Sequence, residues 1–350
     1  MKYLEIDASH GEGGGQLTRL AMALAAITGR ALHLKDIRAR RAKPGLMAQH
    51  LTALRAVAAL SGGELAGAAL GATQVEFRPG PIRGGEYRFQ VGTAGSISLV
   101  LQAVLPVALR ADGPCLLHIS GGTDVKMAPP LDYLRLVFLP WLAAMGAEVR
   151  LESVRHGYYP RGGGEVGVTV TPGGPLKPLW LEDPGPLREI RGVAHVAHLP
   201  RHIPERMAAT ARSVLADLAP VHIETRVLGD AEACGQGGAL VLIAETERSR
   251  LGVSVVAERG VTAEKLGHAA ARSLRAEIAA GATLDIHAAD QLLIYAALAR
   301  GASRFTVREV SGHARTVMWL IEQFLPVRFK VTSRDGLEQV DVVPEPRTGS

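Results

Sequence analysis

The stretch HGEGGGQLTR, residues 10–19, places one carboxylate, Glu12, among four glycines directly before an apolar helix pattern. It is not a Walker loop, which ends in G-K-[ST], and Gln16 stands where a Rossmann fingerprint needs its third glycine. Glycines before a helix still present free N–H groups, and the helix dipole favours an anion. A phosphate beside Glu12 needs a bridging cation, Mg²⁺ or Mn²⁺, because the carboxylate otherwise repels it. The alternative is a tight turn with Glu12 in solvent.

Further glycine-rich or basic stretches stand at predicted junctions between strands and helices. They are RARRAKPG (residues 38–45), GGEYRFQVGTAGS (84–96), SGGTDVKMAPP (120–130) and RHGYYPRGGGE (155–165). The first carries Arg38, Arg40 and Arg41, and arginine binds phosphate in bidentate fashion. Any one of these stretches is explained equally well by a solvated loop. Several of them at element junctions indicate a shared cleft for a polyanion.

His313 opens the last predicted helix, in SGHARTVMWLIEQFLPVRF (residues 311–329), with Ser311 as its N-cap. The dipole at a helix N-terminus disfavours imidazolium, so we expect His313 to stay neutral. A neutral imidazole has a lone pair for acid–base work, metal binding or nucleophilic attack. The alternative is an ordinary capping or surface histidine. HAADQ, residues 287–291, is likewise either plain helix-start chemistry or a source of ligand contacts from Asp290 and Gln291.

A recurring order of elements would position these residues. Strands predicted at residues 3–6, 32–37, 64–68 and 74–78 and helices at 16–28 and 44–61 follow the order β-α-β-α-β-β. The order recurs over residues 86–171, with one helix running from Pro129 and Pro130 to about residue 146. A third copy starts with a strand at 177–181 and resumes over residues 289–343, with helices at 289–300 and 312–324. Three copies indicate repeated units, each with helices covering one face of a four-stranded sheet.

Residues 183–278 do not fit the repeat. They read as strand, helix (204–218), three strands (221–228, 238–245 and 251–258) and helix (262–278). We therefore predict an α/β (α+β) fold in which three β-α-β-α-β-β units form a large domain and a small α/β domain is inserted in the third. The predicted boundaries place the large domain at 1–182 and 279–343, the insert at 183–278, and a tail at 344–350.

The composition is that of a globular protein: 47% of the 350 residues are hydrophobic, and the formal net charge is +5. The basic excess suits an anionic partner such as a nucleotide or nucleic acid, although chance explains it equally well. Cys115 and Cys234 form no CxxC pair, which is typical of a reduced cytoplasmic protein. The N-terminus begins with a strand pattern rather than a signal peptide, and no apolar run is long enough to span a membrane. We expect a cytoplasmic protein with no membrane partner.

Seven stretches in order carry a resemblance to a known family. They are HGEGGGQLTR, RAKPGLMAQHLTA, YRFQVGTAGS, SGGTDVKMAPPLDY, RHGYYPRGGGEV, ADQL and SGHARTV…FLPVRF. Together they closely resemble the RNA 3′-terminal phosphate cyclase family over residues 2–343, most weakly in the 183–278 segment. The architecture of that family, three repeats plus a small α/β insert, agrees with the organisation read from the element pattern.

The resemblance implies an ATP-dependent nucleotidyl transferase that acts on RNA with a 3′-phosphate end. In the family a histidine attacks the α-phosphorus of ATP and becomes a covalent histidine–AMP. The AMP moves to the RNA 3′-phosphate, and the adjacent 2′-OH then expels it, which leaves a 2′,3′-cyclic phosphate. The adenylylated end supplies the good leaving group that a phosphomonoester lacks, and the neighbouring 2′-OH benefits from proximity. The activation step also admits other phosphate-ended nucleic acids.

The resemblance also implies roles for individual residues. His313 matches the nucleophile, and Glu12 matches the acid that binds Mg²⁺ or Mn²⁺. Residues that match positions lining the phosphate and RNA 3′-end site are Gln16, Arg19, Arg38 and Arg41. Residues that match the ATP pocket are Gln102, Pro130, Tyr133, His287, Ala288, Ala289, Asp290 and Gln291. His287 departs from the family, where a tyrosine is common, and Arg40 stands where glycine is frequent.

Two other functions remain open at this point. Enolpyruvate transferases have a related fold, but they are longer and need neither ATP nor a histidine nucleophile. Ribosome-assembly relatives of the cyclases keep the fold and an RNA-binding surface but lack the nucleophile. His313 and the intact GEGGGQ stretch favour the enzyme over the non-catalytic relative.

Overall fold

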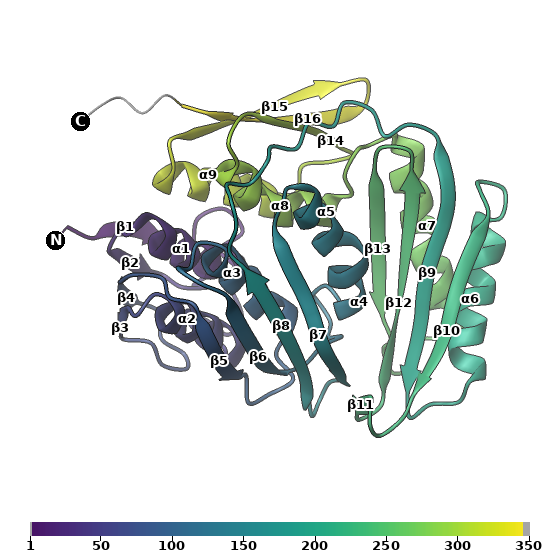
Figure 1. The fold of residues 1–350 in the computed structure, drawn as a ribbon. Coiled ribbons are helices and arrows are strands. Elements are labelled where there is room, and N and C mark those ends of the chain that lie inside the picture. The colour runs from purple at the N-terminus through teal and green to yellow at the C-terminus, as the bar shows by residue number, and fades with distance from the viewer. Residues whose placement is uncertain (1, 346–350) are drawn as a thin grey trace.

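The first of the four β-sheets in residues 2–345 is formed by the N-terminal part of the chain (Figure 1). The computed structural model describes residues 2–345. The strand order is β1 (Leu4–Asp7), β2 (Leu32–Lys35), β4 (Val75–Arg78), β3 (Glu64–Ala66). β1 and β2 are parallel because α1 (Gly15–Thr28) crosses between them, and the remaining pairs are antiparallel. α2 (Ala48–Leu60) connects β2 to β3 and begins four residues later than predicted.

The second sheet has the order β11-β7-β8-β6-β5. Its strands are β5 (Gly85–Gln90), β6 (Cys115–Gly121), β7 (Glu148–Gly157), β8 (Gly164–Thr171) and β11 (Ala233–Cys234). α3 (Ile97–Ala108) crosses between the parallel strands β5 and β6. The helix predicted to end at residue 146 is instead three segments: α4 (Leu131–Tyr133), a π-helix η1 (Leu134–Phe138) and α5 (Leu139–Ala144). Pro140 lies just after the π segment and has no N–H for an i→i−4 bond, which favours the break.

The third sheet lies at the C-terminal end and has the order β14-β16-β15, all antiparallel. Its elements are α8 (Ile286–Leu298), β14 (Ser303–Val307), α9 (Gly312–Phe324), β15 (Val327–Arg334) and β16 (Leu337–Pro344). The strand predicted at 177–181 is wrong, because only a single parallel bridge between Trp180 and Arg304 forms there. Pro178 removes a ladder donor in this segment. Of the predicted tail, residues 346–350 lie outside the described residues.

The fourth sheet has the order β10-β9-β12-β13, with its own apolar core. Its elements are β9 (Leu187–Ala197), α6 (His202–Leu215), β10 (Val221–Leu228), β12 (Gly237–Thr246), β13 (Arg250–Val256) and α7 (Ala263–Ala280). The helices α6 and α7 pack together and cover the outer face of the sheet (Figure 1). The elements predicted here from periodicity are present, and the strand over residues 221–228 has the predicted bounds.

The main apolar core joins the first three sheets through their helices. α1 packs against α2, α3 and α9, and α8 packs against α9. Close approach is possible because α1 is rich in buried alanine. These contacts bring the N-terminal glycine loop and the start of α9 together, although they belong to opposite ends of the sequence. None of the helices in residues 2–345 is long and apolar enough to cross a bilayer.

Candidate active site

The glycine loop before α1 docks on the first turns of α9. Gly11 and Gly13 have φ values of +58° and +56°, which favour glycine. A methyl group on Gly11 would also lie 2.2 Å from Oγ1 of Thr316. That hydroxyl accepts from the Glu12 N–H at 3.3 Å and donates to the Gly312 carbonyl at 2.8 Å. The bare backbone of this loop is therefore needed for its contact with the last helix.

Glu12 and His313 face each other across this contact. Nδ1 of His313 lies 3.1 Å from Oε2 of Glu12, and the two side chains remain 44% and 40% exposed. Gly312 leaves room for the carboxylate, because a Cβ there would lie 2.4 Å from Oε1 of Glu12. If the His313 Nδ1–H donates to Glu12, Nε2 keeps its lone pair. The pair combines an oriented imidazole with a carboxylate that is open to solvent.

Ser311 and Asp290 position the start of α9. Oγ of Ser311 accepts from the Ala314 N–H at 2.9 Å as the predicted N-cap. The same hydroxyl donates to the carboxylate of Asp290, 2.8 and 2.9 Å from its two oxygens. Burial raises the pKa of Asp290 to about 7, against the opposing hydrogen bond from Ser311, and Asp285 and Glu12 raise it further. Asp290 thus ties α8 to the helix that carries His313.

Asp285 organises the other end of the predicted nucleotide pocket. It caps α8 by accepting from the N–H groups of His287 and Ala288, at 3.1 and 2.9 Å. Its carboxylate also accepts from the Tyr133 hydroxyl at 2.7 Å and from the Gly252 N–H at 2.9 Å. Tyr133 is 1% exposed, so its ring is interior and its hydroxyl is already bonded. The structure therefore places Tyr133 as a buried link between α4 and α8.

Gln16, Gln102, Asp290 and Gln291 converge on one small cavity, with Phe138 and Tyr295 among its other lining residues. Their elements are α1, α3 and α8. Gln291 donates to the His287 carbonyl at 2.9 Å, and its Oε1 is buried with no partner among the described residues. His287 is exposed, Ala288 and Ala289 are buried, and buried Pro130 is the residue before α4.

Basic side chains surround the glycine loop. Arg41 donates to the Glu12 carbonyl at 3.4 Å, and Arg40 donates to the Gly11 carbonyl at 3.5 Å. Arg38 donates to the Gly45 carbonyl at 2.7 Å. Arg19 is 4% exposed; its Nε has no partner within residues 2–345, and burial lowers its pKa to about 10. The loop is therefore a positive environment around one carboxylate, as anion binding requires.

His50 supports the loop from α2 and was not singled out from the sequence. Its Nδ1 accepts from the Met47 N–H at 3.1 Å, and a Cβ on Gly15 would lie 2.0 Å from its Nε2. Burial, followed by the charges of Arg19 and Arg38, lowers the pKa of His50 to about 3. The sequence signal that could have identified His50 is a capping pattern, because His50 stands three residues after Met47. Nothing local pointed to Thr316.

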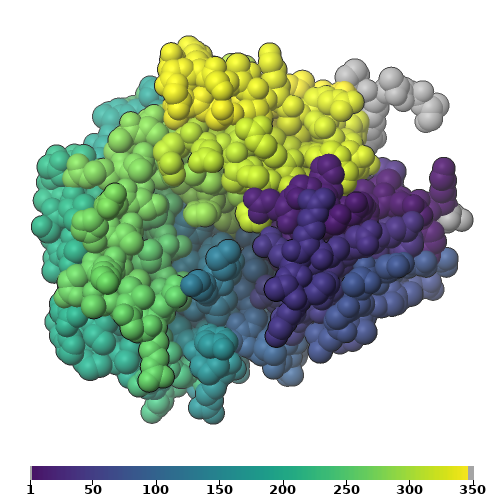
Figure 2. All heavy atoms as spheres, turned by 180° about the vertical axis from the view of Figure 1, so that it is seen from behind, coloured from purple at the N-terminus to yellow at the C-terminus, as the bar shows by residue number. Residues whose placement is uncertain are grey.

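The site lies where the glycine loop near the N-terminus meets the start of α9. Figure 2 shows the purple N-terminal residues directly against the yellow C-terminal residues on one face, which is hollowed between the purple and green parts. The predicted residues that meet there are Glu12 with His313 and Arg41 with the glycine loop. Gln16, Gln102, Asp290 and Gln291 share the adjacent cavity. Pro130 and Tyr133 lie in the interior beside this cluster.

Comparison with known proteins identifies the family. The model of the RNA 3′-terminal phosphate cyclase family matches residues 10–331. An RNA 3′-terminal phosphate cyclase from Nitrosospira multiformis is 54% identical over 97% of this chain and 97% of the relative. Proteins of the same name from Pyrobaculum neutrophilum and Methanopyrus kandleri are 44% and 41% identical, covering 94% and 99% of this chain and 94% and 100% of theirs. The chain belongs to the RNA 3′-terminal phosphate cyclase family, which confirms the resemblance seen in the motifs.

The similarity to a solved enolpyruvyl transferase is low. The enolpyruvyl transferase NikO from Streptomyces tendae aligns with a TM-score of 0.28 and 16% identity, over 51% of this chain and 32% of that one. A likeness at that level says nothing about fold or activity.

Proposed function

We propose that this protein is an ATP-dependent enzyme that converts an RNA 3′-terminal phosphate to a 2′,3′-cyclic phosphate through a covalent histidine–AMP. The observation that carries the proposal is the contact between His313 Nδ1 and Glu12 at the glycine loop, in a chain of the cyclase family. An imidazole oriented by a carboxylate is the arrangement expected of a histidine nucleophile.

His313 Nε2 is the attacking atom in this proposal. It forms a bond to the α-phosphorus of ATP while the bond to pyrophosphate breaks. An oxygen of the RNA 3′-phosphate then takes the AMP from the histidine. Finally the 2′-oxygen attacks the 3′-phosphorus, loses its proton and expels AMP. Glu12 stabilises the positive charge that develops on His313 during the first step, because its carboxylate lies at the opposite ring nitrogen.

The carboxylate of Glu12 also fits a divalent cation, Mg²⁺ or Mn²⁺. These ions favour oxygen ligands and are commonly held by one or two carboxylates together with substrate phosphates. Glu12 is 40% exposed, and Arg40 and Arg41 lie beside it, donating to the carbonyls of Gly11 and Glu12. Such a cation supplies charge neutralisation for phosphate beside a carboxylate.

The remaining predicted residues divide into two groups by their surroundings. Gln16, Arg19, Arg38 and Arg41 lie on or beside the glycine loop and are proposed to hold phosphates and the RNA 3′ end. The cavity lined by Gln102, Asp290 and Gln291 is proposed to continue into the nucleotide pocket. The far side of the pocket is shaped by Pro130, Tyr133 and residues 287–289. Tyr133 is buried and acts indirectly, through its hydrogen bond to Asp285.

We also infer the repeat organisation predicted from the sequence. In the first sheet, the order β1-β2-β4-β3 has one parallel pair followed by antiparallel pairs. In the second sheet, the order β5-β6-β8-β7 shows the same pattern. The bridge at Trp180 adds a parallel partner to β14 and supports the same order in the third sheet. Residues 183–278 then read as the insert. The cytoplasmic location stays a prediction.

Labelling tests the histidine step without RNA. The protein is incubated with Mg²⁺ or Mn²⁺ and ATP labelled at the α- or the γ-phosphate, beside His313→Ala and the control His268→Ala, an exposed residue of α7. We expect acid-labile, alkali-stable label on the protein from the α-position alone, lost in His313→Ala and kept in the control.

An RNA arm tests the acceptor. RNA ending in a 3′-phosphate should remove the label and become cyclic, whereas the same RNA with a 3′-hydroxyl should do neither. Label that persists in His313→Ala contradicts the proposed nucleophile. A protein that takes no label with either metal but still binds RNA favours the non-catalytic function.

A further inference from the structure

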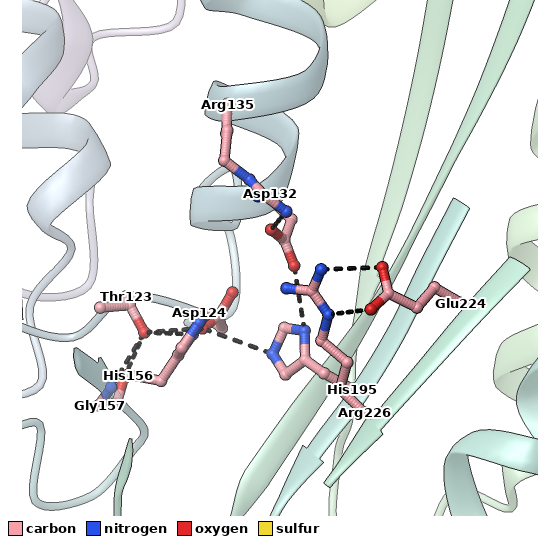
Figure 3. Close-up of polar contacts among 9 residues, drawn as sticks. All are labelled: Thr123, Asp124, Asp132, Arg135, His156, Gly157, His195, Glu224 and Arg226. Carbon is pink, nitrogen blue, oxygen red and sulfur yellow. Dashed lines mark hydrogen bonds and ion pairs between the residues drawn. The ribbon is translucent and has the colours of Figure 1, made fainter. Parts of the chain in front are cut away.

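A second cluster of titratable side chains lies away from the Glu12–His313 contact, between the second and fourth sheets. Asp124 lies in the loop between β6 and α4, His156 near the end of β7, and His195 in β9 (Figure 3). One ligand atom from each of the three lies within 4.8 Å of the other two. Asp124 and His195 are each 1% exposed. Buried side chains of this kind need a defined partner.

The distances within the cluster suit one shared ion. His156 Nδ1 lies 2.7 Å from Asp124 Oδ2, and His195 Nε2 lies 3.8 Å from the same oxygen. Ligands on a tetrahedral zinc ion, with bonds near 2.0–2.1 Å, are about 3.3 Å apart. The two observed separations lie on either side of that value. Small side-chain movements would bring the three donors onto one cation.

The surrounding groups orient His195 as a metal ligand. Its Nδ1 lies 3.3 Å from Asp132 Oδ2 in α4. With the ring proton on Nδ1, facing that carboxylate, the Nε2 lone pair faces Asp124. Histidines that bind metals commonly donate their other ring N–H to a carboxylate in this way. Asp132 is held in turn by Arg135 at 2.8 Å. Thr123 donates to Asp124 Oδ2 at 2.6 Å and fixes that carboxylate.

Two buried atoms of the cluster lack hydrogen-bond partners. His195 Nε2 and Asp124 Oδ1 make no hydrogen bond with the described residues. The Tyr158 hydroxyl is also buried without one, on a ring 6.2 Å from that of His156 and 6.3 Å from that of His195. Buried polar atoms without partners are costly, and a bound ion is one way to satisfy them.

We propose that Asp124, His156 and His195 form a binding site for a divalent transition-metal ion of the zinc class. Imidazole nitrogens with one carboxylate suit Zn²⁺ rather than Mg²⁺, which prefers oxygen ligands. Three protein ligands leave a fourth position for water. The site is therefore distinct in chemistry from the cation proposed at Glu12.

The ion ties two sheets together. Asp124 and His156 belong to the five-stranded sheet and the loop that follows β6, whereas His195 is in the central part of the four-stranded sheet. Of the strands in residues 2–345, only the short β11, which follows β10 of the four-stranded part, pairs with the five-stranded sheet, with Ala233 opposite His156. A metal bound next to this pairing would reinforce it and would hold α4 through Asp132.

Metal retention by the full-length protein tests the proposal without ATP or RNA. The protein is stripped with a chelator, loaded with Zn²⁺ or Co²⁺, dialysed and analysed for metal content. We expect about one equivalent to be retained, with visible d–d bands of low-symmetry Co²⁺ and a higher Tm for the loaded protein.

Variants assign the ion to this cluster. His195→Gln and Asp124→Asn should lose the retained metal, whereas His222→Gln, an exposed histidine of β10 in the same sheet, should keep it. Asp132→Asn removes no ligand and is the gentler change, so it should fold and bind metal about 10- to 100-fold more weakly. Glu12→Ala should retain the ion, which separates this proposal from the proposed activity.

Three results would overturn the site. They are no retained metal in the unaltered protein, equal retention in the folded ligand variants, and an unchanged affinity in Asp132→Asn. Any of these would make the cluster a hydrogen-bonded contact between two sheets and nothing more.

Discussion

At the scale of single residues, the Glu12–His313 contact depends on the lack of a side chain at Gly312. Gly312 is the first residue of α9, and a Cβ there would lie 2.4 Å from Oε1 of Glu12. Because no backbone strain is involved, Gly312→Ala should fold with a free energy of unfolding within about 0.5 kcal/mol of the original. Displacing the carboxylate should slow protein adenylylation by about 10- to 100-fold.

Gly173→Ala is the matched control for this change. A Cβ at Gly173 meets no heavy atom within 4 Å, so adenylylation should be unaffected. Rapid labelling of Gly312→Ala would show that the position of Glu12 does not matter to the histidine.

His50 makes the glycine loop sensitive to acid. In the folded protein its pKa is lowered to about 3, chiefly by burial, whereas the ordinary value is 6.5. Between pH 6.5 and 3 the unfolded chain therefore binds a proton at His50, whereas the folded chain does not. The stability that depends on this group is present above pH 6.5 and is lost as the pH falls toward 3. Between pH 7 and 5 the unaltered protein should lose about 1–2 kcal/mol more stability than His50→Gln.

Urea unfolding at the two pH values measures this difference. His268→Gln, at an exposed position on α7, should show the pH dependence of the unaltered protein. An acid response in His50→Gln as steep as in the unaltered protein would mean that His50 is protonated in the fold.

At the scale of elements, the N-cap of α9 both caps its helix and holds a second side chain. Ser311 accepts from the Ala314 N–H and also donates to Asp290. Thr262 caps α7 in the same way, accepting from the Lys265 N–H, but is not a residue of the proposed site. Ser311→Ala and Thr262→Ala should each cost about 1 kcal/mol of stability.

Only Ser311→Ala should also slow adenylylation. Its loss leaves Asp290 without the donor that restrains it and frees the first turn of α9, which carries His313. Denaturant unfolding together with the labelling rate distinguishes the two effects. Equal labelling rates in the two variants would reduce Ser311 to a plain helix cap.

The elements also show which patterns could be read from the chain. Strand 221–228 and helix 312–324 have the predicted bounds, because alternation and capping are local signals. The predicted strand at 177–181 is a single bridge, since Pro178 weakens it and its partner is the distant β14. The π segment Leu134–Phe138 has no periodicity signal of its own.

At the scale of the whole molecule, the formal net charge is +5, and two of the basic side chains lie at the glycine loop. Arg40 and Arg41 are exposed there and donate to the loop carbonyls. If the RNA 3′ end binds at this place, the logarithm of affinity should fall linearly with the logarithm of salt, by about 0.7 per phosphate contacted on single-stranded RNA. Arg41→Ala should weaken binding and reduce this slope by about that amount.

Arg272→Ala is the control for general charge. Arg272 is exposed on α7, outside the site, and its removal should leave the slope unchanged. Binding of a short 3′-phosphorylated RNA over a salt series measures both variants. Equal slopes for Arg41→Ala and the unaltered protein would place the RNA elsewhere.

The sequence by itself determined the local parts of this protein. The glycines around Glu12, the cap at Ser311 and the first-turn position of His313 are all properties of residues a few positions apart, which is why they could be read directly. The ordered motifs likewise identified the family that the comparisons confirm.

Only the tertiary structure decided which of these parts meet. The packing of α1 on α9 brings Glu12 to His313, and the order of the sheets brings Asp124 and His156 to His195. It also buried Tyr133, whose hydroxyl is bonded to Asp285 rather than open to a ligand. The physical reason is that side chains distant in sequence converge through helix packing and strand order, which local propensity and periodicity do not encode.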